Sequence, residues 1–455
     1  MTRLVVVGGN AAGLSAASRA KRRSPSLEVE VLEAGHDISY SSCGIPYLVE
    51  GLVEDAGQLL VLSPQDAAER GIQVRTDSRA VAFNPYTKEV VFEQGGRRDS
   101  VHYDKLLLAT GAAPRNPFPG GDLDGVFAIR HLGDGLRLME RMQQGDPEAV
   151  AVVGGGYVGL EMAAAFQARA SEVHLLQRGP RLLPSMDADI TDGLNDWVAE
   201  AGIHVHLDAE VKRFTEGKKA GQLARVEARH PLDADVAIVA VGVQPATEFA
   251  VKAGVLATKE GHILVDDQMR TNFHDVWAAG DCVAARHILT GRPTSVPLAL
   301  PSNRMGRVAG DSIAASTESI PGPSLYFPGL IGTAIARVFG LAFAQTGLTE
   351  QACKAEGIDC VTALIESKSR AAYLPDAADM AVKVVAEHGS GKLLGAQVVG
   401  PEEAGLRINA AAVAIQAGMK VGKLAEVETA YAPPFGPVWD PLIVAAEQCA
   451  KEVRK

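Results

Sequence analysis

Two stretches of the chain share one pattern of apolar and polar positions: a short β-branched run, a glycine-rich turn and a segment of small residues. They are RLVVVGGNAAGLSAASRA (residues 3–20) and AVAVVGGGYVGLEMAAAF (149–166). The β-branched run predicts a buried strand, and the small residues predict a helix packed closely against it. A second strand follows each stretch, in EVEVLEAG (28–35) and EVHLLQRGPRLL (172–183). The pattern predicts an α/β chain with two Rossmann-like dinucleotide-binding domains.

The glycine spacing in both turns favours nucleotide binding. The second copy has the full G-x-G-x-x-G spacing, at Gly154, Gly156 and Gly159. These glycines let a pyrophosphate approach the free N–H groups at a helix N-terminus. The first copy has Gly8 and Gly13 but Asn10 in the middle position, while Glu33 ends the next strand 20 residues beyond Gly13, where an acid can bind a ribose hydroxyl. A glycine-rich turn without a ligand is the alternative, but two such folds in one chain suggest a flavin and a nicotinamide.

More distant segments extend this picture. Two further strand-to-turn segments follow the two folds at similar offsets, YDKLLLATGAAPR (103–115) and ADVAIVAVGVQPA (234–246). In AAGDC, the turn at Gly280 and Asp281 places a carboxylate where ribityl hydroxyls can donate to it, although capping of the next helix is an alternative. A helix that begins near Leu298 and Ala299 would point its N–H groups at the flavin pyrimidine ring.

Length and composition narrow the class of protein. A chain of 455 residues is too long to fold around one hydrophobic core, so we expect two or three domains. The net charge of −11 argues against a broad nucleic-acid-binding surface. The apolar run at the N-terminus is too short for a signal peptide or a membrane span, so we expect a cytoplasmic protein without a membrane partner. The five cysteines have no metal-ligand spacing, so we expect no metal site and no disulfide scaffold.

Cys43 lies in ISYSSCGIPYL (38–48), far from the next cysteine, Cys282. The residues CGIPYLV predict a short helix that begins at Cys43, with Pro46 tolerated in its first turn. Because thiol pKa values fall at helix N-termini, we expect a lowered pKa and a reactive thiolate. Without a nearby cysteine, its oxidised state would be a mixed disulfide with a small thiol, or a sulfenic acid. A buried, inert cysteine is the alternative.

The motifs together resemble a known family. The two glycine loops, LLLATG and AAGDC resemble the FAD-dependent pyridine nucleotide-disulfide oxidoreductases. GGNAAGLSAASRAKR, SYSSCGIPY and YAPPFGPVWDP resemble the coenzyme A-disulfide reductase branch, which includes NADH oxidases and coenzyme A persulfide reductases. The resemblance implies an FAD domain at 1–120 and 245–322, an NAD(P)H domain at 121–244, and a C-terminal α+β dimerisation domain at 323–455. It also implies a homodimer.

The resemblance assigns roles to individual residues. The positions that it implies for FAD are Gly8, Asn10, Ala11, Ala12, Gly13, Glu33, Val81, Thr110, Gly111, Gly280, Asp281, Leu298 and Ala299. Those for the nicotinamide cofactor are Gly154, Gly156, Tyr157, Val158, Gly159, Glu161, Gln177, Arg178 and Gly242. The implied catalytic residues are Cys43 and two tyrosines of the partner subunit, Tyr373 and Tyr431. A phenol can protonate a leaving thiol, although interface packing is the alternative for both tyrosines.

Coenzyme A is the expected small thiol. Helical spacing places Ser15, Arg19 and Arg22 on one face, where two arginines can hold phosphates, although a solvated basic face is the alternative. The resemblance adds Ser39 and Ser42 beside the cysteine. Four positions depart from the pattern expected of the branch. Arg19 stands where an amide is expected, and Ser42 stands where Asn is expected. Asn303 and Trp439 stand where His and Lys are expected. A different small disulfide, or a persulfide, is therefore also allowed.

The second fold bears on the choice of nicotinamide. Gln177 ends its second strand where an NADH-specific site usually has an acid, and Arg178 follows, with Arg181 nearby. An arginine accommodates the 2′-phosphate of NADPH, so NADPH is favoured over NADH. The alternative is that these arginines are surface charges and that NADH binds without ribose selection.

Three functions fit the sequence. The first is reduction of a low-molecular-weight disulfide or persulfide, above all coenzyme A disulfide, by NAD(P)H through FAD and Cys43. The second is an NAD(P)H oxidase that reduces oxygen through a Cys43 sulfenic acid. The third is an electron-transfer flavoprotein reductase with a protein partner, in which Cys43 would be dispensable.

Overall fold

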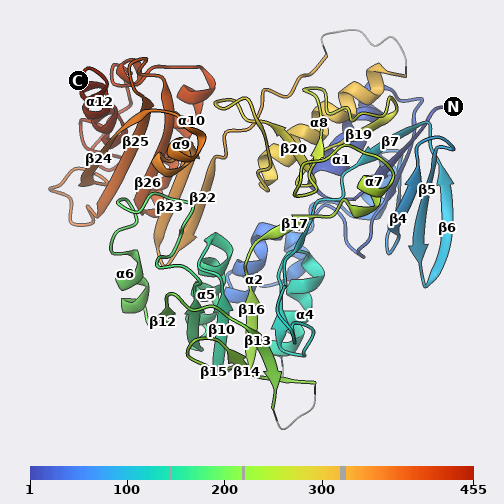
Figure 1. The fold of residues 1–455 in the computed structure, drawn as a ribbon, viewed down its shortest axis with the longest axis horizontal. Helices are drawn as coiled ribbons and strands as arrows, with labels where there is room; N and C mark the ends of the chain where they lie inside the picture. The colour runs from blue at the N-terminus through green and yellow to red at the C-terminus, as the bar shows by residue number, and fades with distance from the viewer. Residues whose placement is uncertain (144, 218–220, 318–323) are drawn as a thin grey trace.

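The structure is a computed structural model that describes residues 1–143, 145–217, 221–317 and 324–455. Figure 1 shows three parts: a first Rossmann-like domain at upper right, a second below it, and a C-terminal domain at upper left. The predicted fold class is confirmed. The domain boundaries stay predictions, and the one at residues 322 and 323 lies outside the described residues.

The first sheet is parallel and has the order β19-β7-β1-β2-β3. Its strands are β1 (Arg3–Val7), β2 (Glu28–Leu32), β3 (Ile72–Arg75), β7 (Lys105–Leu108) and β19 (Val276–Ala278). Helix α1 (Ala11–Arg23) packs against α8 (Ala299–Ala315) at close range, since a Cβ at Gly306 would lie only 2.2 Å from the Ala12 carbonyl oxygen. The distant AAGDC segment therefore joins the first glycine loop in one domain.

Shorter elements complete this domain. They are η1 (Ser42–Gly44), α2 (Ile45–Glu50), η2 (Ala56–Leu59), α3 (Pro64–Glu69), β4 (Arg79–Asn84), β5 (Glu89–Gln94), β6 (Arg97–His102), α7 (Glu248–Lys252), β18 (Ile263–Leu264), β20 (Val283–Arg286) and β21 (Pro293–Thr294). The ladder β4-β5-β6 is antiparallel, and its register shifts between Ala80 and Ala82, which makes Val81 a β-bulge residue.

The second sheet repeats the plan, with parallel strands in the order β12-β11-β10-β16-β9. Its elements are β9 (Val126–Phe127), α4 (Leu132–Met142), β10 (Ala149–Val153), α5 (Tyr157–Ala168), β11 (Glu172–Leu176), α6 (Leu194–Glu200), β12 (Ile203–His206), β13 (Arg213–Glu216), β14 (Leu223–Glu227), β15 (Leu232–Asp233) and β16 (Val236–Val239). The two strand-to-turn segments of the sequence, residues 103–115 and 234–246, lie side by side. Their strands β8 (Ala112–Pro114) and β17 (Val243–Pro245) pair antiparallel.

The C-terminal domain is an antiparallel sheet covered by helices. Its elements are β22 (Ala334–Val338), β23 (Leu341–Gly347), α9 (Glu350–Glu356), β24 (Cys360–Lys368), β25 (Asp379–Glu387), β26 (Leu393–Pro401), η3 (Glu402–Arg407), α10 (Ile408–Gln416), α11 (Val421–Leu424) and α12 (Pro441–Val453). The sheet order is β22-β23-β26-β25-β24. Buried residues of α10 and α12 form its core together with β25 and β26.

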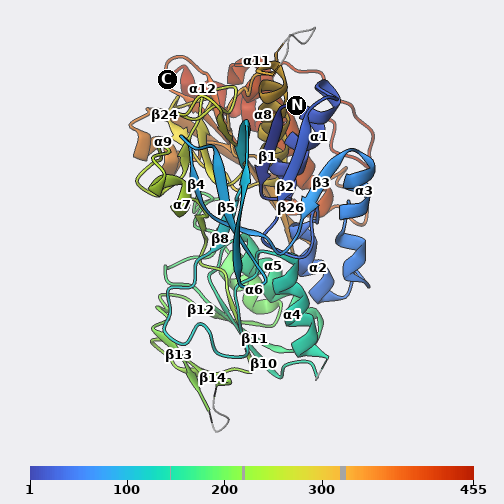
Figure 2. The ribbon, with the colours of Figure 1, turned by 90° about the vertical axis from the view of Figure 1, so that its right-hand side faces the viewer.

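Helix α2 belongs to the first domain in chain order but packs into the second. Ile45 and Val49 share one buried apolar core with Phe166 of α5 and Phe343 of β23. Figures 1 and 2 both place α2 beside α5. The segment that carries Cys43 is therefore fixed where all three domains meet.

A buried ion cluster joins the second domain to the C-terminal domain. Lys383 of β25 is only 1% exposed, and its amine lies 2.8 Å from Asp189 and 2.9 Å from Glu350. The same amine is 3.3 Å from Asp187, whose carboxylate also accepts the Gln397 amide at 2.6 Å. Burial opposes the charge on Lys383, but these carboxylates outweigh it and raise its pKa. The cluster holds both domains in one arrangement.

Replacing Lys383 with Met is expected to destabilise the protein by about 3 kcal/mol, because it leaves the buried Asp187 carboxylate without its cation. The shift of the urea unfolding midpoint measures the loss. Lys368→Met is the control, since that amine pairs with Asp379 at the surface, 2.7 Å away, and its loss is expected to cost less than about 1 kcal/mol. Equal effects of the two substitutions would contradict a role for burial.

Candidate active site

The two glycine loops are built in the same way. Gly8 has φ +108° and a Cβ there would lie 2.2 Å from the Ala109 carbonyl oxygen; Gly154 has φ +112° and a Cβ there would lie 2.4 Å from that of Ala240. Only glycine satisfies both constraints. At Gly156, in contrast, a Cβ would have no atom within 4 Å, so the backbone borders open space. This is the arrangement that a pyrophosphate at a helix N-terminus needs.

Glu33 and Gln177 occupy equivalent places beside these loops. The Gly9 N–H donates to Glu33 Oε2 at 2.6 Å, and the Gly155 N–H donates to Gln177 Oε1 at 3.0 Å. The same hydrogen bond therefore ends in a carboxylate in the first domain and in a neutral amide in the second. The difference alters the charge beside the two glycine loops and leaves their hydrogen bonding alike.

The Asp281 turn has partners that the sequence did not predict. Its carboxylate accepts the Ser302 hydroxyl at 2.7 Å and pairs with Arg130. Helix α8 begins at Ala299 with Leu298 as its N-cap, as predicted. Because Ser302 lies in the first turn of α8, this hydrogen bond brings the Asp281 carboxylate close to the helix N-terminus. Together with the first glycine loop, the two offer acceptors and donors that fit a flavin dinucleotide.

Cys43 lies in the turn η1, immediately before α2, so the predicted short helix is confirmed in position. All five cysteines are among the described residues, and each is a free thiol, with Cys43 exposed at the surface. Although exposed by surface area, its sulfur is surrounded by enough protein to raise its pKa, and the Glu161 carboxylate raises it further. Arg130 opposes this effect, but less strongly. The expected lowering of the Cys43 pKa is therefore wrong.

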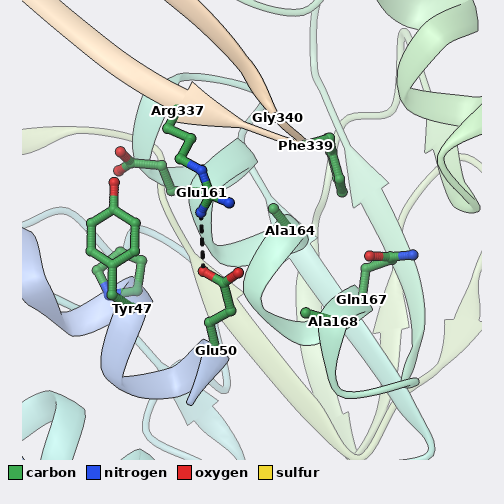
Figure 3. Close-up of a pocket in the computed structure, with 10 residues that line it drawn as sticks. Tyr47, Glu50, Glu161, Ala164, Gln167, Ala168, Arg337, Phe339 and Gly340 are labelled. Carbon is green, nitrogen blue, oxygen red and sulfur yellow. Dashed lines mark ion pairs between the residues drawn. The ribbon is translucent and has the colours of Figure 1, made fainter. Parts of the chain in front are cut away.

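Glu161 of α5 borders a cavity of about 150 Å³ at the junction of the three domains, drawn in Figure 3. Its side chain is largely buried, and burial raises its pKa to about 7. The cavity is also bordered by Tyr47 and Glu50 of α2 and by Arg337 of β22. Arg337 reaches across to Glu50 at 3.7 Å, the contact dashed in Figure 3, and also pairs with Glu402.

The residues of α1 that are predicted to bind coenzyme A differ in their contacts. Ser15 donates to Asn303 at 2.7 Å, so these two predicted residues do lie together. Arg19, however, directs two N–H groups at the buried Asp311, at 2.6 and 3.0 Å. Arg19 therefore also stabilises the α1–α8 contact, whereas Arg22 is exposed, and the role of both arginines in holding phosphates stays a prediction. No motif in the sequence marked Asp311 as the partner of Arg19.

Two further residues predicted to bind coenzyme A, Ser39 and Ser42, precede the cysteine. Ser39 has φ +48°, a left-handed conformation, and its carbonyl oxygen accepts the Val61 N–H at 2.8 Å. Ser42 hydrogen-bonds with Cys43 and lowers its pKa, against the larger opposing effects. Both serines therefore shape the turn that presents the thiol, whatever they bind.

The predicted partner-subunit residues lie at the surface of the C-terminal domain. Tyr373, Tyr431 and Trp439 are 74%, 46% and 70% exposed, and Phe435 nearby in sequence is 80% exposed. Tyr373 and Tyr431 hydrogen-bond with one another. Within the described chain neither tyrosine is among the groups that shift the Cys43 pKa. The structure thus brings the two tyrosines together but not to the cysteine of their own chain.

Comparison with known proteins decides the family. The model of the pyridine nucleotide-disulphide oxidoreductase family matches residues 2–302, and that of its dimerisation domain matches residues 333–441. The chain belongs to this family. The family is FAD-dependent and uses pyridine nucleotides, so the chain is an oxidoreductase of that kind, and the family prediction made from the glycine loops is confirmed. No helix in the described ranges is long and apolar enough to cross a membrane.

Three curated relatives match nearly end to end. The NAD(P)H coenzyme A polysulfide/persulfide reductase of Pyrococcus horikoshii is 38% identical over 448 residues, covering 98% of this chain and 97% of that protein. An NADH oxidase of Methanocaldococcus jannaschii is 32% identical and covers 99% of both chains. A coenzyme A disulfide reductase of Staphylococcus haemolyticus is 27% identical and covers 96% of both.

Solved structures of related enzymes have the same fold as this chain. An NAD-dependent persulfide reductase from A. fulgidus superposes with a TM-score of 0.93 at 34% identity, covering 99% of this chain and 83% of that one. An engineered water-forming NADPH oxidase, made from the Lactobacillus brevis NADH oxidase, has a TM-score of 0.92 at 26% identity and covers 100% of this chain and 99% of its own. Relatives of this oxidoreductase therefore act on sulfur compounds and on oxygen.

Proposed function

We propose that this oxidoreductase uses NAD(P)H to reduce a low-molecular-weight disulfide or persulfide, above all coenzyme A disulfide, with Cys43 as its single redox-active thiol. The observation that supports this most is the place of Cys43, an exposed free thiol in a turn where the two dinucleotide-binding domains meet. The names of the P. horikoshii and S. haemolyticus relatives point to the same substrates.

Separate groups of residues would hold the two cofactors. The first glycine loop, Glu33, Asp281 and the start of α8 would hold FAD, which supplies two-electron transfer between nicotinamide and sulfur when bound. The second loop would hold the nicotinamide nucleotide, with Gln177 and Arg178 at its ribose. Helix α2, which follows the Cys43 turn, packs against α5 of the second domain, so the turn is fixed where these two domains meet.

Cys43 would carry out the sulfur chemistry. Its thiolate attacks one sulfur of the disulfide, the S–S bond breaks, one coenzyme A leaves as a thiolate, and Cys43 enters a mixed disulfide. Two electrons that originate from NAD(P)H break this second S–S bond, which releases the other coenzyme A and returns Cys43 to the thiolate. In a homodimer, Tyr373 and Tyr431 of the opposite subunit would protonate the leaving thiolate.

NADPH is the favoured donor. Gln177 is neutral where an acid would repel a 2′-phosphate, and Arg178 is exposed and makes no side-chain hydrogen bond or ion pair with any described residue. Arg181, in contrast, donates to the Leu183 and Pro184 carbonyl oxygens at 3.3 and 3.2 Å. The engineered NADPH oxidase carries the same kind of change, an aspartate replaced with alanine and the following alanine replaced with arginine.

The acceptor can be decided in one experiment. Purified protein supplied with NADPH is assayed side by side with coenzyme A disulfide, coenzyme A persulfide and oxygen, following absorbance at 340 nm and oxygen uptake. We expect a sulfur acceptor to be turned over faster than oxygen. The 32% identical NADH oxidase favours the second candidate, an oxidase, and oxygen uptake that matches NADPH use without any sulfur acceptor would establish it instead.

A further inference from the structure

The Cys43 reaction needs a proton from solvent in each turnover, and the cavity beside Glu161 bears on where it comes from. Reduction of a disulfide by NADPH consumes one proton: NADPH, H⁺ and RSSR give NADP⁺ and two RSH. Each cycle also places a negative charge on Cys43 and removes it again. A group that takes up a proton as this charge forms would stabilise the thiolate.

Among the residues that the structure describes, Glu161 has no cationic partner. Within the described part of the chain it makes no ion pair and no hydrogen bond, although Arg337 borders the same cavity. That guanidinium is already paired with Glu50 and Glu402. A largely buried carboxylate without a partner favours its protonated form, and the pKa of about 7 lets Glu161 exchange a proton near neutral pH.

Glu161 also acts on the reactive thiol. Its charge raises the pKa of Cys43 and that of Tyr47, which lies beside it in Figure 3. The coupling is reciprocal, so a thiolate at Cys43 favours a proton on Glu161. The other charged groups facing this thiol are Arg130, which opposes Glu161, and Asp281, which contributes less.

The cavity gives Glu161 access to solvent. A wider, more open groove of about 570 Å³ adjoins the cavity and shares Tyr47 and Arg337 with it. Along α5 the cavity wall continues from Glu161 to Ala164 and Ala168, whose small side chains leave the space free. A cavity of this volume, lined by polar groups, has room for water.

We propose that Glu161 holds the solvent proton that balances the charge on Cys43, and that it exchanges this proton through the cavity between α2, α5 and β22. When two electrons break the mixed disulfide, Cys43 becomes a thiolate and Glu161 takes up a proton. When the thiolate attacks the next disulfide, the new S–S bond removes the charge, and Glu161 releases its proton to the water of the cavity, while the tyrosines of the opposite subunit protonate the departing thiolate. This inference rests on the proposed function and names a residue that the function needs.

The test is the alkylation rate of Cys43 by iodoacetamide as a function of pH, read by mass spectrometry of the peptide that contains it. Glu161→Gln removes the charge with little change of shape, so the midpoint of the rate profile is expected to shift to lower pH. Glu161→Asp keeps the carboxylate and should hold the midpoint closer to wild type. Glu50→Gln is the matched control, because Glu50 borders the same cavity but is paired with Arg337; its midpoint should stay.

A second variant tests the cavity. Ala164→Leu fills part of the space and is expected to lower turnover while the alkylation midpoint stays at the wild-type pH. An unshifted midpoint in Glu161→Gln, an equal shift in Glu50→Gln, or full turnover in Ala164→Leu would each overturn the proposal. Alkylation needs no sulfur substrate, so the midpoints of the Glu161 and Glu50 variants are independent of whether coenzyme A disulfide is the acceptor. The turnover of Ala164→Leu is measured with whichever acceptor the wild-type protein turns over fastest.

Discussion

Exchanging Cys43 for serine is expected to lower turnover of the sulfur acceptor by about 10³-fold or more, because loss of a covalent nucleophile removes the reaction path that it provides. Reduction of an artificial one-electron dye by NADPH should persist, since both dinucleotide-binding loops are untouched. The measurement is kcat/KM for the disulfide and for the dye in the same preparation, with bound flavin quantified by absorbance.

Cys360→Ser is the control for this experiment. Cys360 begins β24 in the C-terminal domain and, like Cys43, is a free thiol that is accessible to solvent, although only partly exposed. Its replacement is expected to leave turnover within about twofold, as for a surface substitution away from the site. If Cys43→Ser kept full activity with the natural acceptor, the protein would be an electron-transfer flavoprotein reductase for which the thiol is dispensable.

Replacing Arg178 with alanine is expected to lower kcat/KM for NADPH roughly 10- to 100-fold and to leave NADH nearly unchanged. A hydrogen bond to a charged group contributes about 1.5–3 kcal/mol, and NADH lacks the phosphate that would receive it. Adding Gln177→Glu to this variant should lower kcat/KM for NADPH further, because a carboxylate would face the 2′-phosphate.

The two nucleotides, compared in steady-state assays with each variant, separate phosphate recognition from folding. Arg181→Ala is the companion variant, since that side chain holds the carbonyl oxygens of its own loop. Any loss of kcat/KM in Arg181→Ala should affect NADPH and NADH alike. A wild-type enzyme that strongly prefers NADH, or an Arg178→Ala variant with unaltered NADPH kinetics, would contradict the assignment.

Local features of the chain were predictable from sequence because a few residues determine them. Gly8 and Gly154 are required by their positive φ and by a neighbouring carbonyl oxygen, so the loops are recognisable wherever they occur. The short helix after Cys43 follows from Gly44 and Pro46 at its start. The family assignment needed little more than these loops and the AAGDC segment.

Interactions between distant segments were not predictable in this way. Arg130 and Asp281 are 151 residues apart, and Arg19 and Asp311 are 292 apart, so no local pattern marks either pair. The same limit explains the error on the Cys43 pKa: a helix N-terminus can be inferred from neighbours in sequence, whereas burial of the thiol and the charge of Glu161 act on it only in the folded chain. Glu161 itself was expected near the nicotinamide, and its cavity was not foreseen.

The packing of α2 bears on how such enzymes can be recombined. The helix lies in the first domain by chain order, yet its apolar face belongs to the core of the second. A chimera that exchanges the nicotinamide module at its chain boundaries would therefore separate Ile45 and Val49 from the surface that they fit. To keep the sulfur in place, the donor module would have to be transplanted with its own cysteine helix.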